Sequence, residues 1–372
     1  MQFAVLNEDQ QGETRVALVP DSIKLLLKQK HGVLVQSGAG EAASIPDAQF
    51  AAAGARVVAD VDELMGRADC LVKIRPVAVE DAKSVPEGKA IIGFLAPLRR
   101  PAVAQILAQR RVAGFSLDSI PRISRAQSMD TLSSMASIAG YKAVLLAASH
   151  LPKFLPMMTT AAGTIRPAQG LILGAGVAGL QAIATARRLG AVVEAFDVRP
   201  AVKEQVKSLG AGFVEIPAAE NLEDKGGYAR QVSSEMLARQ QKVLSERVRL
   251  ADFIISTAQV PGQPAPRLIT KEMAAEMKPG SVIIDLAAES GGNCELTQAD
   301  QIVRHGGVTI LGPTNLPASL PLDASRMFGR NLASFILEIT NENGFTMDWN
   351  NEIFTQTCIT LNGEANARRR AA

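Results

Sequence analysis

Residues 171–179 read LILGAGVAG, a pattern that indicates a strand, a glycine-rich turn and the start of a helix. A short apolar run precedes the glycines, and a helix-forming stretch from 180 to 189 follows them and stops at Gly190. In a dinucleotide-binding βαβ unit, Gly174 allows a tight turn and Gly176 lets a pyrophosphate approach the backbone. Gly179 lets the helix pack closely on the strand. The helix N-terminus then faces the phosphates, with Ala175 and Val177 lying between the glycines.

The acidic residue that such a unit requires is also present. The next apolar run, 192–196, ends at Asp197, about twenty residues after the glycines. A carboxylate here accepts hydrogen bonds from the adenosine ribose and repels a 2′-phosphate, so we expect NAD(H) in preference to NADP(H). Val198 and Arg199 follow, and the charge of Arg199 works against that repulsion. A βαβ turn without a ligand remains the alternative.

The whole chain of 372 residues predicts an α/β fold. Short apolar runs alternate with helix-period stretches, which is typical of parallel βαβ units, and the length favours two domains. We predict two Rossmann-like, doubly wound parallel sheets joined by long crossing helices. The first series has strands at 2–6, 33–36, 70–73, 90–94 and 112–115, with helices at 21–30 and 101–109. The second series has strands at 171–173, 192–196, 212–216, 253–256, 281–286 and 308–311.

Two long helical stretches, 133–150 and 323–341, lie outside both series and are expected to cross between the domains. The tail after residue 341 would then return to the first domain. The first Rossmann-like domain would comprise 1–132 and 335–372. The nucleotide-binding domain would comprise 133–334 with its linking helices.

Composition argues against several classes of function. Hydrophobic residues make up 47% and charged residues 20%, as in a packed globular chain. A net charge of +2 and 4% aromatic residues give no basic surface or stacking platform for nucleic acid. The three cysteines and three histidines are too scattered for a disulfide framework or a metal site. The first residues lack the features of a signal peptide, and the best apolar candidate for a membrane span, 171–186, is short and rich in glycine. We expect a soluble, cytoplasmic protein.

A closer resemblance rests on longer strings. Residues 174–191, 197–200 (DVRP) and 122–130 (RISRAQSMD) resemble the NAD(H)-binding component of proton-translocating nicotinamide nucleotide transhydrogenase. So do PMM at 156–158 and AAGT at 161–164, and the resemblance extends over essentially the whole chain.

This resemblance implies a function as well as a fold. It implies a homodimer on the cytoplasmic face of the inner membrane, bound to a membrane-embedded proton-channel subunit. It implies hydride transfer of the Re/Si type, not the Si-specific type. The hydride would pass between NAD(H) bound here and NADP(H) on a separate NADP(H)-binding component, coupled to proton translocation.

By the same resemblance, residues 122–133 hold the nicotinamide end of the nucleotide. Arg122 can donate to the carboxamide or the pyrophosphate, and Asp130 and Ser133 can bond the carboxamide. Gln127 would face the incoming NADP(H). The alternative for each is a polar residue that stabilises the loop, and for Ser133 it is a helix N-cap.

Two further segments complete the expected nucleotide site. Residues 217–234 are polar and acidic, with no strand or helix period, which indicates a long functional loop. Within it, Tyr228 resembles the tyrosine of the family's mobile loop, which closes over bound nucleotide. An ordinary surface tyrosine is the alternative. Thr257, Ala258 and Pro261 follow a predicted strand, where a Rossmann strand end meets its cofactor.

The relationship extends to alanine dehydrogenase, with informative differences. Arg15 and Lys73 resemble that enzyme's substrate-binding arginine and lysine, and they are either remnants of that site or supports of the fold. Its catalytic histidine would fall within 92–97, where this chain has no histidine, and Glu289 stands where its catalytic aspartate would be. Oxidising an amine or alcohol carbon needs a base, whereas hydride exchange between two nicotinamides needs none.

The sequence therefore predicts the NAD(H)-binding component of a transhydrogenase. Two alternatives stay open. One is an alanine dehydrogenase-like, NAD-dependent amino-acid dehydrogenase. The other is a non-catalytic NAD(H)-sensing module that signals to a membrane partner.

Overall fold

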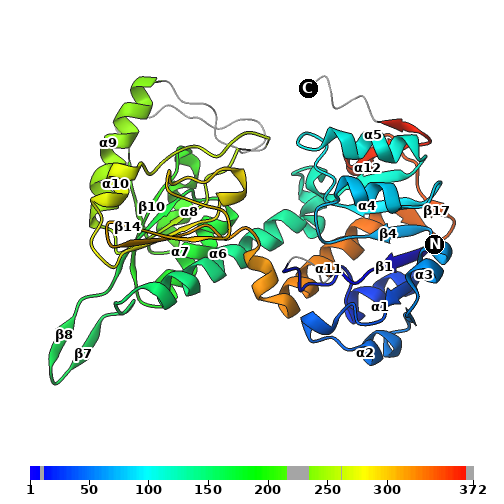
Figure 1. Ribbon diagram of the computed structural model, residues 1–372, viewed down its shortest axis with the longest axis horizontal. Helices are drawn as coiled ribbons and strands as arrows, with labels where there is room; N and C mark the ends of the chain where they lie inside the picture. The colour runs from blue at the N-terminus through cyan, green and yellow to red at the C-terminus, as the bar shows by residue number, and fades with distance from the viewer. Residues whose placement is uncertain (9–11, 216–233, 261, 366–372) are drawn as a thin grey trace. The chain divides into compact units, whose positions relative to one another are not determined.

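The computed structural model describes residues 1–8, 12–215, 234–260 and 262–365. The chain divides into two compact units. Unit 1 comprises Met1–Met135 with Pro317–Ala372, and unit 2 comprises Ala136–Leu316. Each unit holds a largely parallel sheet with helices, so the predicted fold class is confirmed (Figure 1).

The sheet of unit 1 has eight strands in the order β19-β18-β6-β5-β4-β1-β2-β3. From β6 to β3 all neighbours are parallel, and the order reverses between β1 and β4, as in a Rossmann fold. β18 pairs antiparallel with β6, so a late segment of the chain extends the sheet that the first segment begins. The strands are β1 Gln2–Val5, β2 Gly32–Gln36, β3 Arg56–Val58, β4 Cys70–Val72, β5 Ala90–Gly93, β6 Ala113–Ser116, β18 Cys358–Leu361 and β19 Glu364–Ala365.

The helices of unit 1 begin where the sequence favours a first turn. Proline occupies the first turn of α1, α5 and α11, and the Asp60 carboxylate caps α3 by accepting from the Asp62 and Glu63 N–H groups. The helices are α1 Pro20–Lys28, α2 Asp47–Ala52, α3 Val61–Arg67, α4 Val79–Ser84, α5 Pro101–Gln109, α11 Pro321–Ile339 and α12 Glu352–Thr357.

Helix α11 lies wholly in unit 1, so the expectation that residues 323–341 cross between the domains was wrong. It packs against α1 and against the 3-10 helix η3 (Ser124–Met129), and ten of its residues are buried. The boundary expected at 334/335 would divide this helix, whereas the units meet between Leu316 and Pro317. The difference arises because α11 places its apolar face in the core of unit 1 along its whole length.

The sheet of unit 2 has seven strands in the order β11-β10-β9-β12-β13-β15-β14. Six are parallel and β14 is antiparallel to β15; the order reverses between β9 and β12. The strands are β9 Gln169–Leu173, β10 Val192–Phe196, β11 Gly212–Phe213, β12 Phe253–Ser256, β13 Val282–Asp285, β14 Ile302–His305 and β15 Val308–Leu311. The helices are α6 Thr131–His150, which begins in unit 1 and continues into unit 2, α7 Val177–Arg188, α8 Lys203–Ser208, α9 Ser234–Leu250 and α10 Lys271–Ala275.

Both faces of this sheet are buried, which explains the continuous apolar run of β12. Phe253 and Ile255 join a core cluster with residues of α6 and α7, including Ile183. Ile254, between them, joins the opposite cluster with Leu244 of α9 and residues of α10. The sheet that carries the carboxyl ends of β9 and β12 is therefore packed on both faces.

Helix α6 is long and apolar enough to cross a membrane, judged by length and composition only. Residues 171–186, the candidate rejected from the sequence as too short and rich in glycine, form the end of β9 and most of α7. In α6, Ala143 and Ala147 are buried in the core of unit 2. A Cβ added to Gly140 would lie 2.1 Å from the Ala178 carbonyl oxygen, so α6 and α7 pack closely. Packing inside unit 2 accounts for the buried apolar residues of this helix.

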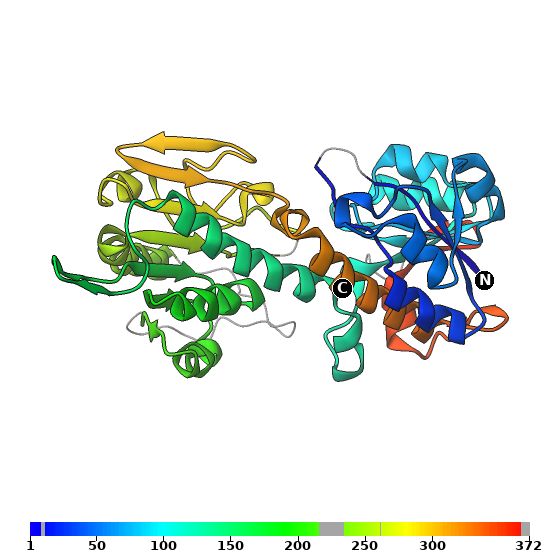
Figure 2. The same cartoon turned by 90° about the horizontal axis from the view of Figure 1, so that it is seen from below.

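A two-stranded antiparallel hairpin projects from the sheet of unit 2 (Figure 2). All residues of β7 (Met158–Thr160) and β8 (Gly163–Ile165) are exposed. Phe154 and Met157, just before it, are 53% and 63% exposed. A smaller hairpin, β16 (Thr340–Asn341) with β17 (Gly344–Phe345), lies in unit 1. Isolated hairpins are marginal in water, and exposed apolar side chains adjoin the hairpin of β7 and β8.

Candidate nucleotide-binding site

The glycine turn after β9 has the backbone geometry that the sequence predicts. Gly174 has φ +95°, and a Cβ there would lie 2.6 Å from the Thr257 hydroxyl oxygen. A Cβ on Gly179 would lie 1.9 Å from the Gly174 carbonyl oxygen, so only glycine lets α7 approach the turn this closely. At Gly176 a Cβ would meet nothing within 4 Å. The protein itself does not require glycine at 176, and the open space there is where a ligand's phosphates would fit.

Helix α7 presents its N-terminus at this open space. Its N-cap residue is Gly176, and no side chain caps the first N–H groups. At its other end, Ala191 N donates to Ala186 O and Gly190 N donates to Arg187 O, which is a Schellman motif with Gly190 at φ +87°. An uncapped N-terminus of a twelve-residue helix favours an anion, as a pyrophosphate would be.

Asp197 follows β10 and is tied to the glycine turn. Its Oδ2 accepts from Ala175 N at 2.7 Å, and its Oδ1 accepts from Arg199 N at 2.9 Å. The Arg199 guanidinium also donates to both carboxylate oxygens, at 2.9 Å each. The four bonds occupy the acceptor positions of the carboxylate, so a ribose hydroxyl would replace one of the Arg199 bonds. Val198 lies partly buried between these residues.

Thr257 and Ala258 lie at the end of β12, beside the same turn. Thr257 N donates to Leu173 O at 2.8 Å, and its hydroxyl donates to Gly174 O at 3.0 Å. The structure thus brings together Gly174, Gly179, Asp197 and Thr257, which the sequence predicted as one site. They meet where the strand order reverses, which is where ligands bind in open α/β sheets.

A buried amide holds Ala258 in place, and sequence reasoning missed it. Asn293, fully buried, accepts from Ala258 N at 3.0 Å and donates to Ala258 O at 2.8 Å. The Asn293 N–H in turn donates to Asp285 Oδ2 at 2.7 Å. Asp285 is also fully buried and accepts from further donors, among them the Thr297 hydroxyl at 2.6 Å. The sequence signal that could have revealed this support is Asp285, an acidic residue at the end of the buried strand β13.

The segment predicted to hold the nicotinamide belongs to unit 1. Asp130 precedes α6, where Asp130 Oδ1 accepts from Ser133 N at 2.9 Å and Oδ2 accepts from the Ser133 hydroxyl at 2.6 Å. The capping role considered for Ser133 therefore falls to Asp130. Arg122 and Gln127 are exposed, and Gln127 lies within η3. Tyr228 and Pro261 lie outside the described residues, as does almost all of the loop predicted at 217–234.

Arg15 and Lys73 are buried, and each lies near at least one buried acidic residue. Arg15 donates from Nε and Nη2 to Glu13, at 2.7 Å each. Lys73 Nζ lies 3.0 Å from Asp81 Oδ1 and 3.7 Å from Glu8 Oε2. Burial raises the pKa of Glu8 above its ordinary value, and the charge of Lys73 opposes that rise. These pairings favour the interpretation in which both cations support the fold.

The positions that correspond to a dehydrogenase's proton-transfer groups are unsuited to that role. Residues 92–97 begin within β5 and contain no histidine, and Glu289 is exposed in the 3-10 helix η5 (Ala288–Ser290). In the described part of the chain, no group of three or more His, Cys, Asp or Glu side chains could hold a metal ion.

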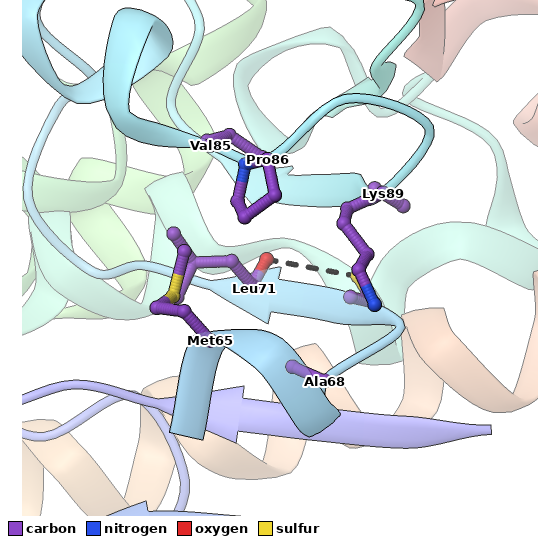
Figure 3. Close-up of a pocket in the computed structure, with 8 residues that line it drawn as sticks. Met65, Ala68, Leu71, Val85, Pro86 and Lys89 are labelled. Carbon is purple, nitrogen blue, oxygen red and sulfur yellow. Dashed lines mark hydrogen bonds between the residues drawn. The ribbon is translucent and has the colours of Figure 1, made fainter. Parts of the chain in front are cut away.

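A small crevice in unit 1 is unrelated to these groups (Figure 3). Met65, Leu71, Val85, Pro86 and Lys89 line it, and it leaves no space for a water molecule. It lies at the amino ends of β4 and β5, the edge opposite to the one at which α/β sheets bind ligands.

The sheet order, the glycine turn and the acidic residue after β10 define a Rossmann protein of the dinucleotide-binding class. Family models agree with this class. The alanine dehydrogenase/PNT N-terminal domain model matches residues 4–139 and the C-terminal domain model matches residues 143–368. The chain belongs to the alanine dehydrogenase/PNT family.

Within this family the similarity to transhydrogenases is high. An NAD(P) transhydrogenase alpha subunit protein of Rhodospirillum rubrum is 43% identical over 372 residues, covering 98% of this chain and 97% of that protein. A crystal structure of transhydrogenase from Sinorhizobium meliloti superposes with a TM-score of 0.89 at 39% identity, covering 98% of this chain and 100% of that chain. Alanine dehydrogenase of Halomonas elongata is 30% identical over 92% of this chain and 88% of that protein. The resemblance to transhydrogenase, and more distantly to alanine dehydrogenase, is confirmed.

Proposed function

We propose that this chain is the NAD(H)-binding component of a proton-translocating transhydrogenase. The observation that carries the proposal is the glycine turn in unit 2, where open space at Gly176 meets the uncapped N-terminus of α7 beside Asp197. Similarity over the whole length to a transhydrogenase alpha subunit supports the choice of reaction.

The residues of unit 2 fit a bound NAD(H). Gly176 and the first turn of α7 would hold the pyrophosphate, and Asp197 would accept from the adenosine ribose. Thr257 and Ala258, held by Asn293, would border the nucleotide at the end of β12. By family resemblance, Tyr228 and Pro261 would join them.

By family resemblance, residues within 122–133 would act at the nicotinamide. Asp130 and Ser133, already bonded to each other, and Arg122 would orient the carboxamide. When bound, NAD(H) supplies or accepts a hydride, and the NADP(H) of the partner is the other reactant. The exposed side chain of Gln127 would meet that second nucleotide. Orientation and exclusion of water are all that these residues must provide, which agrees with the absence of a histidine from 92–97.

The proposed assembly has three kinds of contact. An NADP(H)-binding component would contact the face around Gln127, and a membrane-embedded proton-channel subunit would hold both components at the cytoplasmic face of the inner membrane. A second copy of this chain would cover apolar surface such as that around β7 and β8. Names of relatives as alpha subunits support the existence of partner subunits.

A reconstituted assay tests the proposal. The chain is mixed with an NADP(H)-binding component, and hydride transfer from NADPH to an NAD⁺ analogue is followed by absorbance. Gln127→Asn should lower the rate by about tenfold or more without changing NADH affinity, because small misplacements of reactants are costly. Asp130→Asn should change both rate and affinity. A full rate of hydride transfer in the Gln127→Asn chain would contradict the proposal that Gln127 contacts the second nucleotide.

The same assay separates the two rival functions. Turnover of pyruvate, ammonia and NADH by the chain alone would identify an alanine dehydrogenase-like enzyme. NADH binding without any transfer in the complete mixture would identify a sensing module.

A further inference from the structure

The 3-10 helix η3 (Ser124–Met129) needs support from neighbouring elements to keep its shape. It has six residues, whereas 3-10 helices rarely exceed about four because their hydrogen bonds are poorly aligned. Only Ala126 and Met129 of this helix are buried. The hydrogen bonds and ion pairs that join η3 to the rest of unit 1 therefore determine the orientation of its exposed residues.

One tie comes from α11. Asn331 Nδ2 donates to the Ser128 carbonyl oxygen at 2.8 Å, across 203 residues of sequence. Asn331 is 8% exposed, and its Oδ1 is buried without a hydrogen-bond partner in the described part of the chain. A buried polar atom without a partner costs about 1–3 kcal/mol. An apolar side chain would avoid that cost, so packing alone does not explain an asparagine here.

A second tie holds the other side of η3. Arg125 Nη2 donates to Asn351 Oδ1 at 2.8 Å, and Arg125 Nη1 lies 3.4 Å from Glu338 Oε1. Asn351 Nδ2 donates to the same Glu338 oxygen at 2.9 Å, which closes the cluster. Residues 125 and 128 are thus tied to the framework of unit 1, and the exposed Gln127 lies between them.

We propose that Asn331 is a positioning residue for hydride transfer. By holding the Ser128 carbonyl it fixes the direction in which Gln127 is presented to the second nucleotide, and the Arg125–Glu338–Asn351 cluster is the second tie. The proposal rests on the proposed function of Gln127. Displacement of a reactant by a fraction of an ångström changes rates strongly, so an anchor outside the reacting groups can control the rate.

Asn331→Asp tests this role because it keeps the size of the side chain. An ionised carboxylate offers no proton to the Ser128 carbonyl, so transfer at pH 8 should fall by about tenfold or more. Burial raises the pKa of an aspartate, and on acidification the protonated carboxyl group can donate again. The rate relative to the unmodified chain at the same pH should therefore recover as pH falls.

Two controls accompany this variant. Asn331→Leu has no proton to regain, so its loss of rate should be the same at every pH. Asn343→Asp makes the same chemical change at an exposed residue of unit 1 and should have the normal rate. NADH affinity, measured by fluorescence titration, should be normal in all three variants.

Three outcomes would overturn the proposal: a normal rate in Asn331→Asp, a loss without pH-dependent recovery, or a fall in NADH affinity proportional to rate. If Asn331→Asp fails to fold, Arg125→Ala decides, because Arg125 is 56% exposed; a slow rate with normal NADH affinity supports the proposal and a normal rate overturns it. Failure of the proposed function is distinguishable, since the unmodified chain would then show no transfer at all.

Discussion

We expect Asp197 and Arg199 together to set the preference for NADH over NADPH. The carboxylate favours an unphosphorylated ribose, but the bidentate guanidinium neutralises part of its charge. We expect NADH to bind more tightly than NADPH. Asp197→Asn should weaken NADH binding by about tenfold, since a charge-assisted hydrogen bond contributes about 1.5–3 kcal/mol. Arg199→Ala should widen the preference for NADH over NADPH. The substitution frees acceptor positions of the Asp197 carboxylate and leaves its negative charge without a neutralising partner. Fluorescence titrations check both changes, and equal affinities in the unmodified chain would refute the role of Asp197.

His31 should make the stability of unit 1 sensitive to acid. Its Nε2 pairs with the Thr340 hydroxyl at 3.0 Å, while its buried Nδ1 has no partner among the described residues. Burial, and then the amino-terminal charge, lower the pKa of His31 below its ordinary value of 6.5. The unfolded chain therefore binds a proton that the folded chain does not, and the free energy of unfolding should fall as pH drops below about 6.5.

Urea unfolding at pH 7.5 and pH 5.5 measures this effect. The fluorescence of Trp349, the single tryptophan, reports on unit 1. His31→Gln should remove a pH-dependent loss whose slope is at most about 1.4 kcal/mol per pH unit, and His150→Gln, at an exposed position, should not. An unchanged pH dependence in His31→Gln would contradict the argument.

Residues that act through the local backbone could be predicted from the sequence, and residues that act through distant partners could not. Gly174 and Gly179 are readable because a tight turn and a close helix require glycine within a few residues of each other. Asn293 supports Ala258 from 35 positions away. Asn331 reaches Ser128 across 203 positions. Only the folded chain brings such pairs together.

Gly176 and Gly179, at the start of helix α7, can be compared by the same substitution, because an added Cβ would clash at Gly179 and meet no atom at Gly176. Gly179→Ala would place a Cβ 1.9 Å from Gly174 O, so α7 must move and unit 2 should lose about 1–3 kcal/mol or more. Gly176→Ala meets no atom within 4 Å and should cost no more than about 1 kcal/mol. Its Cβ would instead occupy the space proposed for the pyrophosphate, so NADH affinity should fall by at least about tenfold. Calorimetry measures the loss of stability, and NADH titration measures the loss of affinity. Normal NADH binding by Gly176→Ala would contradict the proposal that the pyrophosphate binds at this turn.

The elements with strong patterns agree with expectation, and the weak ones were missed. β12 and β15 have the predicted bounds because most of their residues are buried apolar side chains. β14 was not predicted, since it is an edge strand without a buried residue. β3 has only three residues, one of them buried, which is too short for a recognisable pattern. β18 forms by pairing with β6, which lies far away in the sequence.

For the whole molecule we expect a homodimer. The hairpin of β7 and β8 exposes every residue and adjoins the exposed Phe154 and Met157. Deleting residues 157–165 and joining the ends with a short glycine linker should give a monomer with normal NADH affinity. Light scattering at micromolar concentration measures the mass. A monomer before the deletion would contradict the expectation.

The route of the chain through the two units has a consequence for biosynthesis. Unit 2 is one uninterrupted stretch, Ala136–Leu316, whereas unit 1 is assembled from a stretch before it and a stretch after it. On the ribosome, unit 2 can complete its core while the early strands of unit 1 still lack α11 and β18. The unit that starts first therefore finishes last, contrary to the usual order in which the leading domain folds first. Stalled nascent chains ending after residue 316 should yield a protease-resistant unit 2 behind a degradable leading segment.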